Sequence, residues 1–216
     1  MSSSVPCTIY RLLSTEYDLT SSEDEFLHFE NPYQILIATI LSAQTTDRTV
    51  NLVTKDLFAR YPDPVSLSTA RQQDVEKIIH RTGFYRAKSR NIIAAAQVLV
   101  NLYGGEVPDE INKLIELPGV GRKTANIVVH HAFDRADGIA VDTHVGRLSG
   151  RLGLSDESNP DRIEQDLLKL FPKKIWGDIN GLFILHGRKV CRARKPSCSC
   201  CVLSSLCRYA ALNTLQ

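Results

Sequence analysis

The sequence predicts an all-α fold, since helical periodicity extends through nearly all of it and the period-two alternation typical of strands is almost absent. Caps support this prediction, because Asn, Asp and Pro recur at the starts of the helical stretches. With 216 residues and 43% hydrophobic content, the chain can bury a sizeable core as one large or two small domains. No internal repeat or low-complexity linker marks a boundary between domains.

The first expected helix is "NPYQILIATILSA", in which Asn31 is the cap and Pro32 the first helical residue. Because it is nearly all apolar, we expect it to be buried on most sides. Asp47 is expected to cap the next helix, which runs toward Arg60 and stops at "YPDP". The following helical stretches are residues 72–80 and 86–102.

In the second half, Pro108 is expected to open a short helix, "PDEINKLIEL". A second short helix, "KTANIVVHHAF", follows, and "GIAVDTH" is expected to be extended. Further helices are expected from about Thr143, in "NPDRIEQDLLKLF", and around residues 176–190.

The net charge of +2 does not by itself indicate a nucleic-acid-binding protein. The segment "RKVCRARK", residues 188–195, has five basic residues in eight, which is typical either of a solvated face or of a phosphate contact. No apolar run reaches ~18 residues, so no membrane span is expected. The N-terminal residues lack a signal-peptide core and include acidic residues early, so an intracellular location is expected.

The segment "LPGVGRKTANIVV", residues 117–129, joins two short helices through Gly119 and Gly121. Glycine permits positive φ and lets the backbone approach a partner closely. The N–H groups that begin the second helix lack helical partners, so they form an anion site suited to a phosphate, which would be bound without reading bases. An ordinary tight turn is the alternative, but it explains the whole Leu-Pro-Gly-Val-Gly unit less well.

Lys123 lies in the first turn of that second helix, where the positive end of the macrodipole disfavours its ammonium form. A free amine there is a nucleophile able to form a Schiff base, although a simple phosphate contact is equally compatible with this segment alone. Asp142, in "AVDTHVGR", follows an apolar extended stretch at a helix start. It is suited to an N-cap, and a carboxylate held ionised in this way can also stabilise positive charge.

Five of the six cysteines are clustered near the C-terminal end, unlike the wider spread of a secreted disulfide protein. Cys191, Cys198, Cys201 and Cys207 have the spacing C-x6-C-x2-C-x5-C. Four thiolates suit either Zn²⁺ or a [4Fe–4S] cluster, and ligand softness alone does not decide between them. Cys200 is the spare cysteine in "CSCC" and is a competing ligand.

Together, "LPGVGRKTA", "VDTH" and the cysteine spacing resemble the helix–hairpin–helix superfamily of DNA glycosylases and AP lyases, from about Asn31 to Cys207. The resemblance implies two helical domains with a DNA-binding cleft between them. A six-helix domain with the hairpin would span residues 25–135. Residues 1–24 and 136–216 would form the second domain, which carries the iron–sulfur cluster loop at residues 191–207.

By the same resemblance, Lys123 takes the position of the nucleophilic lysine and Asp142 that of the essential aspartate. The four spaced cysteines would hold a [4Fe–4S] cluster that is mainly structural. It would pin the basic loop against DNA, with phosphate contacts from Arg192, Arg194 and Lys195.

A glycosylase must take its target base out of the stack, and the vacated space has to be filled. Gln44, in "LSAQTTD", matches a family position whose amide enters the gap, and Phe84, in "TGFYRAKS", matches an apolar wedge. An exposed loop aromatic can instead pack locally. His144 is expected beside the aspartate, either contacting DNA or orienting the loop.

The resemblance therefore implies a monomeric base-excision repair enzyme acting on duplex DNA with oxidised or damaged pyrimidines. Lys123 would displace the base as a Schiff base, and β-elimination would cleave the strand on the 3′ side. The rivals are a monofunctional mismatch glycosylase, for adenine or for uracil and thymine, and a non-catalytic DNA-binding module. Lys123 argues against the first rival, because family members that only excise bases lack this lysine. The Lys123 and Asp142 pair argues against the second, because binding alone needs neither the amine nor the carboxylate.

Overall fold

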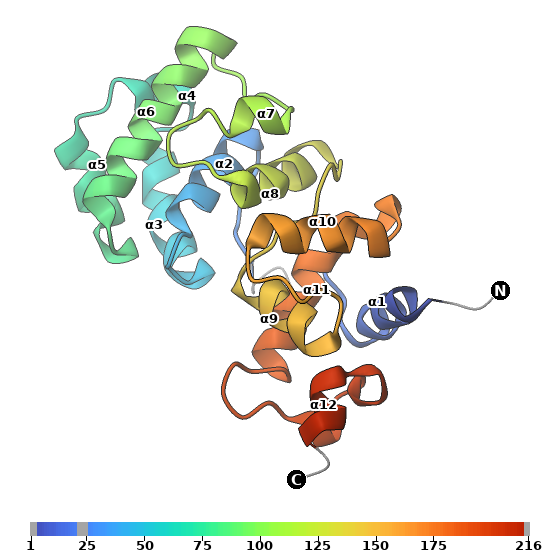
Figure 1. Cartoon of the computed structure of the whole chain (residues 1–216). Helices are drawn as coiled ribbons and strands as arrows, with labels where there is room; N and C mark the ends of the chain where they lie inside the picture. Colours follow the sequence, from blue (N-terminus) through green and yellow to red (C-terminus); the bar gives the residue numbers. More distant parts are fainter. Residues whose placement is uncertain (1–3, 21–25, 214–216) are drawn as a thin grey trace. The chain divides into compact units, whose positions relative to one another are not determined.

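The computed structural model describes residues 4–20 and 26–213, and within these ranges it contains helices and no strand (Figure 1). The predicted all-α fold is confirmed. No helix in these ranges is long and apolar enough to span a membrane. The α-helices are α1 (Val5–Glu16), α2 (Pro32–Leu41), α3 (Asp47–Arg60), α4 (Pro64–Ser68), α5 (Gln72–Ile79), α6 (Tyr85–Tyr103), α7 (Ile111–Leu114), α8 (Arg122–Phe133), α9 (Thr143–Leu152), α10 (Pro160–Leu170), α11 (Trp176–Lys189) and α12 (Arg208–Asn213).

The chain divides into two compact units. The continuous unit is Ser22–Arg135, and the discontinuous unit combines Met1–Ser21 with Ala136–Gln216. The expected boundary between residues 24 and 25 lies outside the described residues. The assignment of two domains with a DNA cleft between them stays a prediction.

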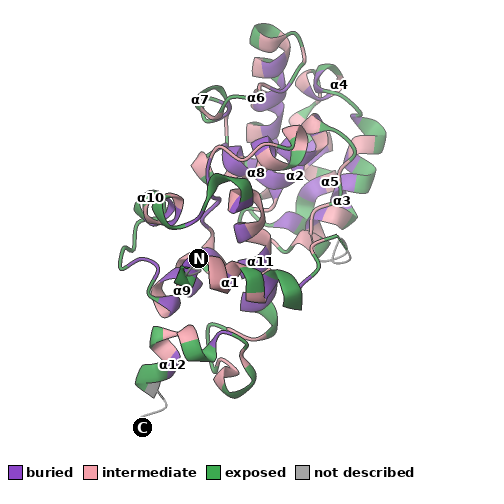
Figure 2. Ribbon diagram, turned by 90° about the vertical axis from the view of Figure 1, so that its right-hand side faces the viewer, coloured by how far each residue is buried: buried purple, intermediate pink, exposed green. Residues whose placement is uncertain are grey.

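The core of the continuous unit is built around α2, whose residues from Ile35 to Leu41 are all buried. It packs against α3, α6 and α8, and Figure 2 shows much of α2 and α8 in the buried colour. The side chain of Asn31 accepts a hydrogen bond from the N–H of Gln34, and Pro32 is the first helical residue, as predicted. A helix this apolar is stable only when it is covered on nearly all sides.

Two predicted helix starts are wrong. Thr46, not Asp47, caps α3, because its hydroxyl accepts from the N–H of Thr49, whereas Asp47 takes the first helical position. Pro108 does not open α7, which begins only after the extended residue Glu110. Helix α1, near the N-terminal end, was not predicted from the sequence.

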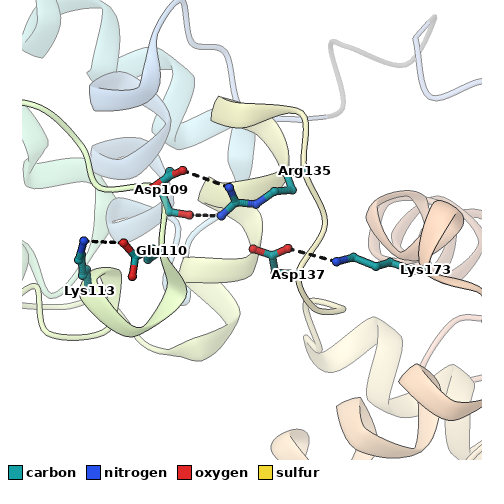
Figure 3. Close-up of polar contacts among 6 residues, drawn as sticks. All are labelled: Asp109, Glu110, Lys113, Arg135, Asp137 and Lys173. Atoms are coloured by element: carbon teal, nitrogen blue, oxygen red, sulfur yellow. Dashed lines mark hydrogen bonds and ion pairs between the residues drawn. The ribbon is translucent and has the colours of Figure 1, made fainter.

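The passage between the two units is held by ion pairs within each unit (Figure 3). Asp134 ends α8 in the left-handed conformation, at φ 49°. Arg135 then binds both the carboxylate and the carbonyl of Asp109, and Asp137 lies 3.6 Å from Lys173. Such exposed pairs each stabilise little, about 0–1 kcal/mol, but they fix the path of the chain. The engaged Asp109 carbonyl also explains why α7 starts late.

In the discontinuous unit, α9 packs against α11 and approaches it closely at Gly187. A Cβ added at Gly187 of α11 would lie 2.5 Å from His144 Nδ1 and 2.7 Å from Arg147 Nη2. A larger residue there would require the His144 and Arg147 side chains to shift, since real Cβ contacts are longer. This close approach brings the start of α9 against the end of α11, just before the cysteine segment.

Candidate nucleic-acid and catalytic site

The segment between α7 and α8 is a hairpin anchored in the core. Leu114, Leu117 and Val120 are buried. Turn hydrogen bonds link the N–H of Leu117 to the carbonyl of Leu114 and the N–H of Val120 to the carbonyl of Leu117, each at 3.0 Å. The apolar residues of the motif thus face inward and fix the hairpin on the unit.

The two glycines of the hairpin differ in whether the local structure requires glycine. Gly119 has φ 82°, and a Cβ there would lie 2.9 Å from Asn91 Nδ2, so the fold itself favours glycine at this position. Gly121 has an ordinary φ of −101°, is exposed, and a Cβ there would meet nothing within 4 Å. The fold therefore does not require glycine at position 121, and its open side is available to a partner.

Gly121 caps α8 without any side-chain hydrogen bond to the first turn. Side chains cap α2, α3, α4, α9 and α10, whereas α1, α5, α6, α7 and α11 share with α8 the lack of a side-chain cap. Gly121 itself has no side chain that could accept from the first turn of α8, and a helix start capped by glycine is an arrangement that can bind anions.

Lys123 is the second residue of α8 and is exposed. Its amine makes no hydrogen bond or ion pair with any described residue. An amine without such a partner is chemically available as a nucleophile.

Asp142 caps α9, as its position at a helix start predicts. Its Oδ1 accepts from the N–H groups of His144 and Val145, each at 2.8 Å, whereas Oδ2 accepts from no described residue. One carboxylate oxygen thus holds the helix and the other is available for chemistry. Asp142 belongs to the discontinuous unit and Lys123 to the continuous unit.

Gln44 and Phe84 lie on two loops of the continuous unit and are both exposed, with Phe84 at 68%. Both have left-handed backbones, with φ 53° at Gln44 and φ 45° at Phe84. Within the described ranges the other non-glycine residues with positive φ are Asp134 and Lys195. Each such conformation costs about 1–3 kcal/mol and persists only where the surrounding structure holds it, and in proteins they cluster at functional sites.

Four of the cysteines line one cavity of the discontinuous unit, together with Arg151 and Tyr209; they are Cys191, Cys198, Cys201 and Cys207. Burial raises the pKa of the Cys198 thiol, and the thiols of Cys207 and Cys191 raise it further. Burial likewise raises the pKa of Cys201, with smaller contributions from the same neighbours. Cys200 is exposed and does not line the cavity. Its thiol donates a hydrogen bond to the Ser197 carbonyl instead.

None of the cysteines in the described ranges forms a disulfide. Across the same residues, no three His, Cys, Asp or Glu side chains converge on a site for a single metal ion. The segment 191–212 has only two buried side chains, Leu203 and Ala210. Figure 2 accordingly shows the region around α12 mainly in the exposed and intermediate colours. So little apolar burial is insufficient to fold such a segment on its own.

The comparisons with known proteins agree on one family. Residues 37–173 match the model of the HhH-GPD superfamily of base excision DNA repair proteins. This chain belongs to that superfamily. It is 51% identical to endonuclease III of Synechocystis sp. over 85% of this chain and 84% of that protein. It is 40% identical to endonuclease III of Escherichia coli over 85% and 86% of the two chains.

Solved structures of HhH-GPD proteins have the same fold. A trapped covalent intermediate of endonuclease III with DNA, an estranged-adenine complex, superposes with TM-score 0.85 at 39% identity, covering 97% of this chain and 98% of that one. A thermostable thymine-DNA glycosylase has TM-score 0.84 at 26% identity, over 96% and 97%. The predicted resemblance is thereby confirmed, as is the function of a base excision repair enzyme, a DNA glycosylase and AP lyase that binds DNA.

Three arginine-mediated contacts of this HhH-GPD chain were not predicted. The Arg147 Nε donates to the Cys191 carbonyl at 3.1 Å, and Arg151 donates to the carbonyls of Arg192 and Ala193 at 2.8 and 3.0 Å. The two arginines are one helical turn apart on α9, so this helix holds the backbone of the basic loop. The loop side chains themselves, Arg192, Arg194 and Lys195, are exposed.

His144 is oriented by the same helix. Its Nδ1 lies 3.2 Å from Arg147 Nη2 and faces Gly187. A buried histidine, His186, was also missed: its Nε2 lies 3.4 Å from Cys201 Sγ, its Nδ1 lies 2.9 Å from the Tyr17 hydroxyl, and burial lowers its pKa to about 4. No local pattern indicates the contacts of His186, since Tyr17 and Cys201 are not its neighbours in the sequence.

Proposed function

We propose that this enzyme removes oxidised or damaged pyrimidines from duplex DNA and cleaves the resulting abasic site on its 3′ side through a Schiff base on Lys123. The unpartnered amine of Lys123, directly after the hairpin, is the observation that carries this proposal. A 39% identical endonuclease III has been trapped as a covalent intermediate with DNA, which supports it.

In this mechanism the first N–H groups of α8 bind one backbone phosphate and so place the sugar beside Lys123. The amine attacks C1′ of the sugar, the bond from C1′ to the base breaks, and the base leaves with the bonding electrons. Opening of the sugar ring gives an imine between C1′ and Nζ. Loss of a proton from C2′ then expels the 3′ oxygen with its phosphate, which breaks the strand.

Asp142 stabilises the positive charge that develops on the sugar as the base leaves. Its Oδ1 is engaged in capping α9, so Oδ2 supplies the interaction or takes part in proton transfer. His144, held by Arg147, contacts the DNA backbone next to the carboxylate or orients that turn.

Gln44 and Phe84 fill the space that the extruded nucleotide leaves in the stack. Their exposure supports this role, because a side chain buried in the protein cannot enter DNA. Gly119 and Gly121 form the phosphate-binding hairpin, and Arg192, Arg194 and Lys195 contact further phosphates, which would make binding steeply salt-dependent. The enzyme acts as a monomer on damaged double-stranded DNA.

The four cysteines that line one cavity would hold a [4Fe–4S] cluster. They fit the group, since their thiols lie within electrostatic range of one another and their segment has almost no apolar core. When bound, the cluster supplies iron–thiolate bonds that fold the basic loop. Cys200 is not a ligand in this proposal.

Borohydride trapping on abasic DNA tests the central step. The wild-type protein should become covalently linked to the DNA, because borohydride reduces the imine to a stable amine. Lys123→Gln should abolish both trapping and strand cleavage while the fold and DNA binding remain. Lys55→Gln, an exposed lysine of α3, is the matched control. If Lys123→Gln is trapped at the wild-type rate, another amine is the nucleophile and the proposal is wrong.

A monofunctional mismatch glycosylase is the second candidate, favoured by the likeness to the thymine-DNA glycosylase. Incubation with a duplex that carries a damaged or mismatched base, with and without borohydride, separates the two. A monofunctional enzyme releases the nucleobase, leaves the strand intact and forms no trapped complex. The proposed enzyme cleaves the strand without treatment with alkali.

A further inference from the structure

Two loops of the continuous unit meet at the buried side chain of Lys88, in the second turn of α6. Its Nζ donates to the Thr45 hydroxyl at 2.7 Å and to the Thr82 carbonyl at 2.8 Å. The Thr45 hydroxyl also donates to that same Thr82 carbonyl. Thr45 follows Gln44 directly, and Thr82 lies two residues before Phe84. One ammonium group therefore links the loops of the two proposed wedge residues.

The backbone strengthens this link. The N–H of Lys88 donates to the carbonyl of Phe84 at 3.0 Å, which forms the first helical hydrogen bond of α6. Lys88 thus holds Phe84 through its backbone and the Gln44 loop through its side chain.

The burial of Lys88 has a cost that a purely structural role does not explain. The residue is 5% exposed, both of its acceptors are neutral oxygens, and no carboxylate of the described residues pairs with it. Burial lowers the pKa of its ammonium. Taking a charge out of water without an opposite charge is unfavourable, and an apolar side chain of similar length would fill the same space more cheaply.

The strained backbones of the two loops supply a reason for the link. Gln44 and Phe84 both have positive φ, which is unfavourable for residues other than glycine, and such conformations persist only where the surroundings determine them fully. The Thr82 carbonyl and the Thr45 hydroxyl lie next to these two positions, so the bonds from Lys88 act where the backbone departs from ordinary geometry.

We infer that Lys88 is a positioning residue that holds Gln44 and Phe84 as one two-residue wedge for base extrusion. This inference rests on the proposed wedge role of those two residues. Lys88 itself need not touch DNA. Its contribution belongs to the step that removes a base from the stack, and it is unnecessary once the nucleotide is already unpaired at an abasic site.

The test compares Lys88→Met with wild type in single-turnover reactions on two duplexes, one with thymine glycol and one with a preformed abasic site. We expect Lys88→Met to slow base excision by about tenfold to a hundredfold, since small misplacements have effects of this size. Cleavage of the abasic duplex, the affinity for undamaged duplex and Tm should stay near wild-type values. Lys55→Met removes one exposed lysine of the same unit and should change none of these.

Two further variants separate positioning from general packing. Thr45→Val removes the hydroxyl that Lys88 binds and should slow excision selectively as well. In a double-mutant cycle, Lys88→Met should add little in a Phe84→Ala background, because the wedge it positions is already lost. Unstacking of a 2-aminopurine placed beside the lesion should fall in parallel with the excision rate.

The outcomes distinguish the inference from the function on which it rests. If Gln44→Ala and Phe84→Ala leave excision unchanged, the wedge role itself is wrong, and the inference falls with it. If those variants slow excision but Lys88→Met does not, the inference alone is overturned. Equal losses on the two duplexes, a large drop in Tm, or full additivity with Phe84→Ala would make Lys88 a structural residue and would also overturn it.

Discussion

At Asp142 only Oδ1 accepts the capping hydrogen bonds of α9, so the effect of the negative charge can be measured separately from the effect of capping. Asparagine caps helices as well as aspartate does, and Asp142→Asn should therefore keep α9 while removing the charge. We expect base release to slow by about a hundred- to a thousand-fold, the loss typical of one preorganised electrostatic interaction. Single-turnover excision and Tm give the two readouts. Excision at the wild-type rate with a neutral amide would show that the charge is not needed.

Lys88 also makes a pH-dependent contribution to stability. Burial lowers the pKa of the folded-state ammonium below its usual value of 10.5, so the unfolded chain binds the proton more tightly. The free energy of unfolding of the wild type should therefore rise, relative to Lys88→Met, as pH increases through the folded-state pKa toward 10.5. Urea unfolding of both proteins from pH 7 to pH 10 measures this difference. A difference that is constant with pH would contradict the assigned cause.

The positions of Lys123 and Asp142 at helix starts were predicted from neighbouring residues, and their catalytic roles stay proposals, whereas contacts between residues far apart in the chain were not predicted. Lys123 and Asp142 are each marked by a helix start a few residues away. Lys88 and Gly187, by contrast, gain their roles from Thr45 and His144, which lie about forty residues away in the chain. Periodicity and caps contain no information on such pairs.

At the scale of the element, the hairpin offers two glycines with opposite expected effects. Gly121→Val introduces no clash and no strained φ, so Tm should stay near wild type. Its side chain should nevertheless block a phosphate from the α8 N-terminus and weaken DNA binding about tenfold or more, the worth of a charged hydrogen bond. Gly119→Val should instead lower Tm by several degrees, because it meets Asn91 and holds a φ of 82°.

Thermal melts and binding to an undamaged duplex of one fixed sequence measure both variants. Gly121→Ala, with a smaller side chain, should bind between wild type and Gly121→Val. Unchanged affinity in Gly121→Val would mean that no backbone approaches this side of the hairpin.

Helices were predicted well where apolar periodicity and a cap coincide, as at Asn31 before α2. The first residues of helices were predicted less accurately, because several neighbouring residues can cap a helix and tertiary contacts decide between them. Thr46 displaced Asp47 in this way at α3. At α7 the contacts of Arg135 with Asp109 shortened a helix that proline alone would have started earlier.

At the scale of the whole molecule, the segment after α11 depends on something other than an apolar core. Only Leu203 and Ala210 are buried between residues 191 and 212, so we expect the cluster to be its main source of stability. Cys198→Ser should lose iron and the brown colour, whereas Cys200→Ser should retain both, since Cys200 lies outside the cavity. Iron and sulfide analysis of protein purified without oxygen measures the outcome, and stoichiometric zinc instead would refute the cluster.

Loss of the cluster should also reduce the salt dependence of DNA binding. The basic loop is held by carbonyl contacts from Arg147 and Arg151 and by the cysteine that precedes it. If the cluster folds this loop, Cys198→Ser should disperse the charges of Arg192, Arg194 and Lys195. Each phosphate contact contributes about 0.9 to the slope of log K against log salt, so three lost contacts lower that slope by about 2.7. Replacing the three residues by alanine in the intact protein should give the same decrease, and combining these changes with Cys198→Ser should lower it no further. A Cys198→Ser protein that keeps the wild-type slope would show that the basic loop binds DNA without the cluster.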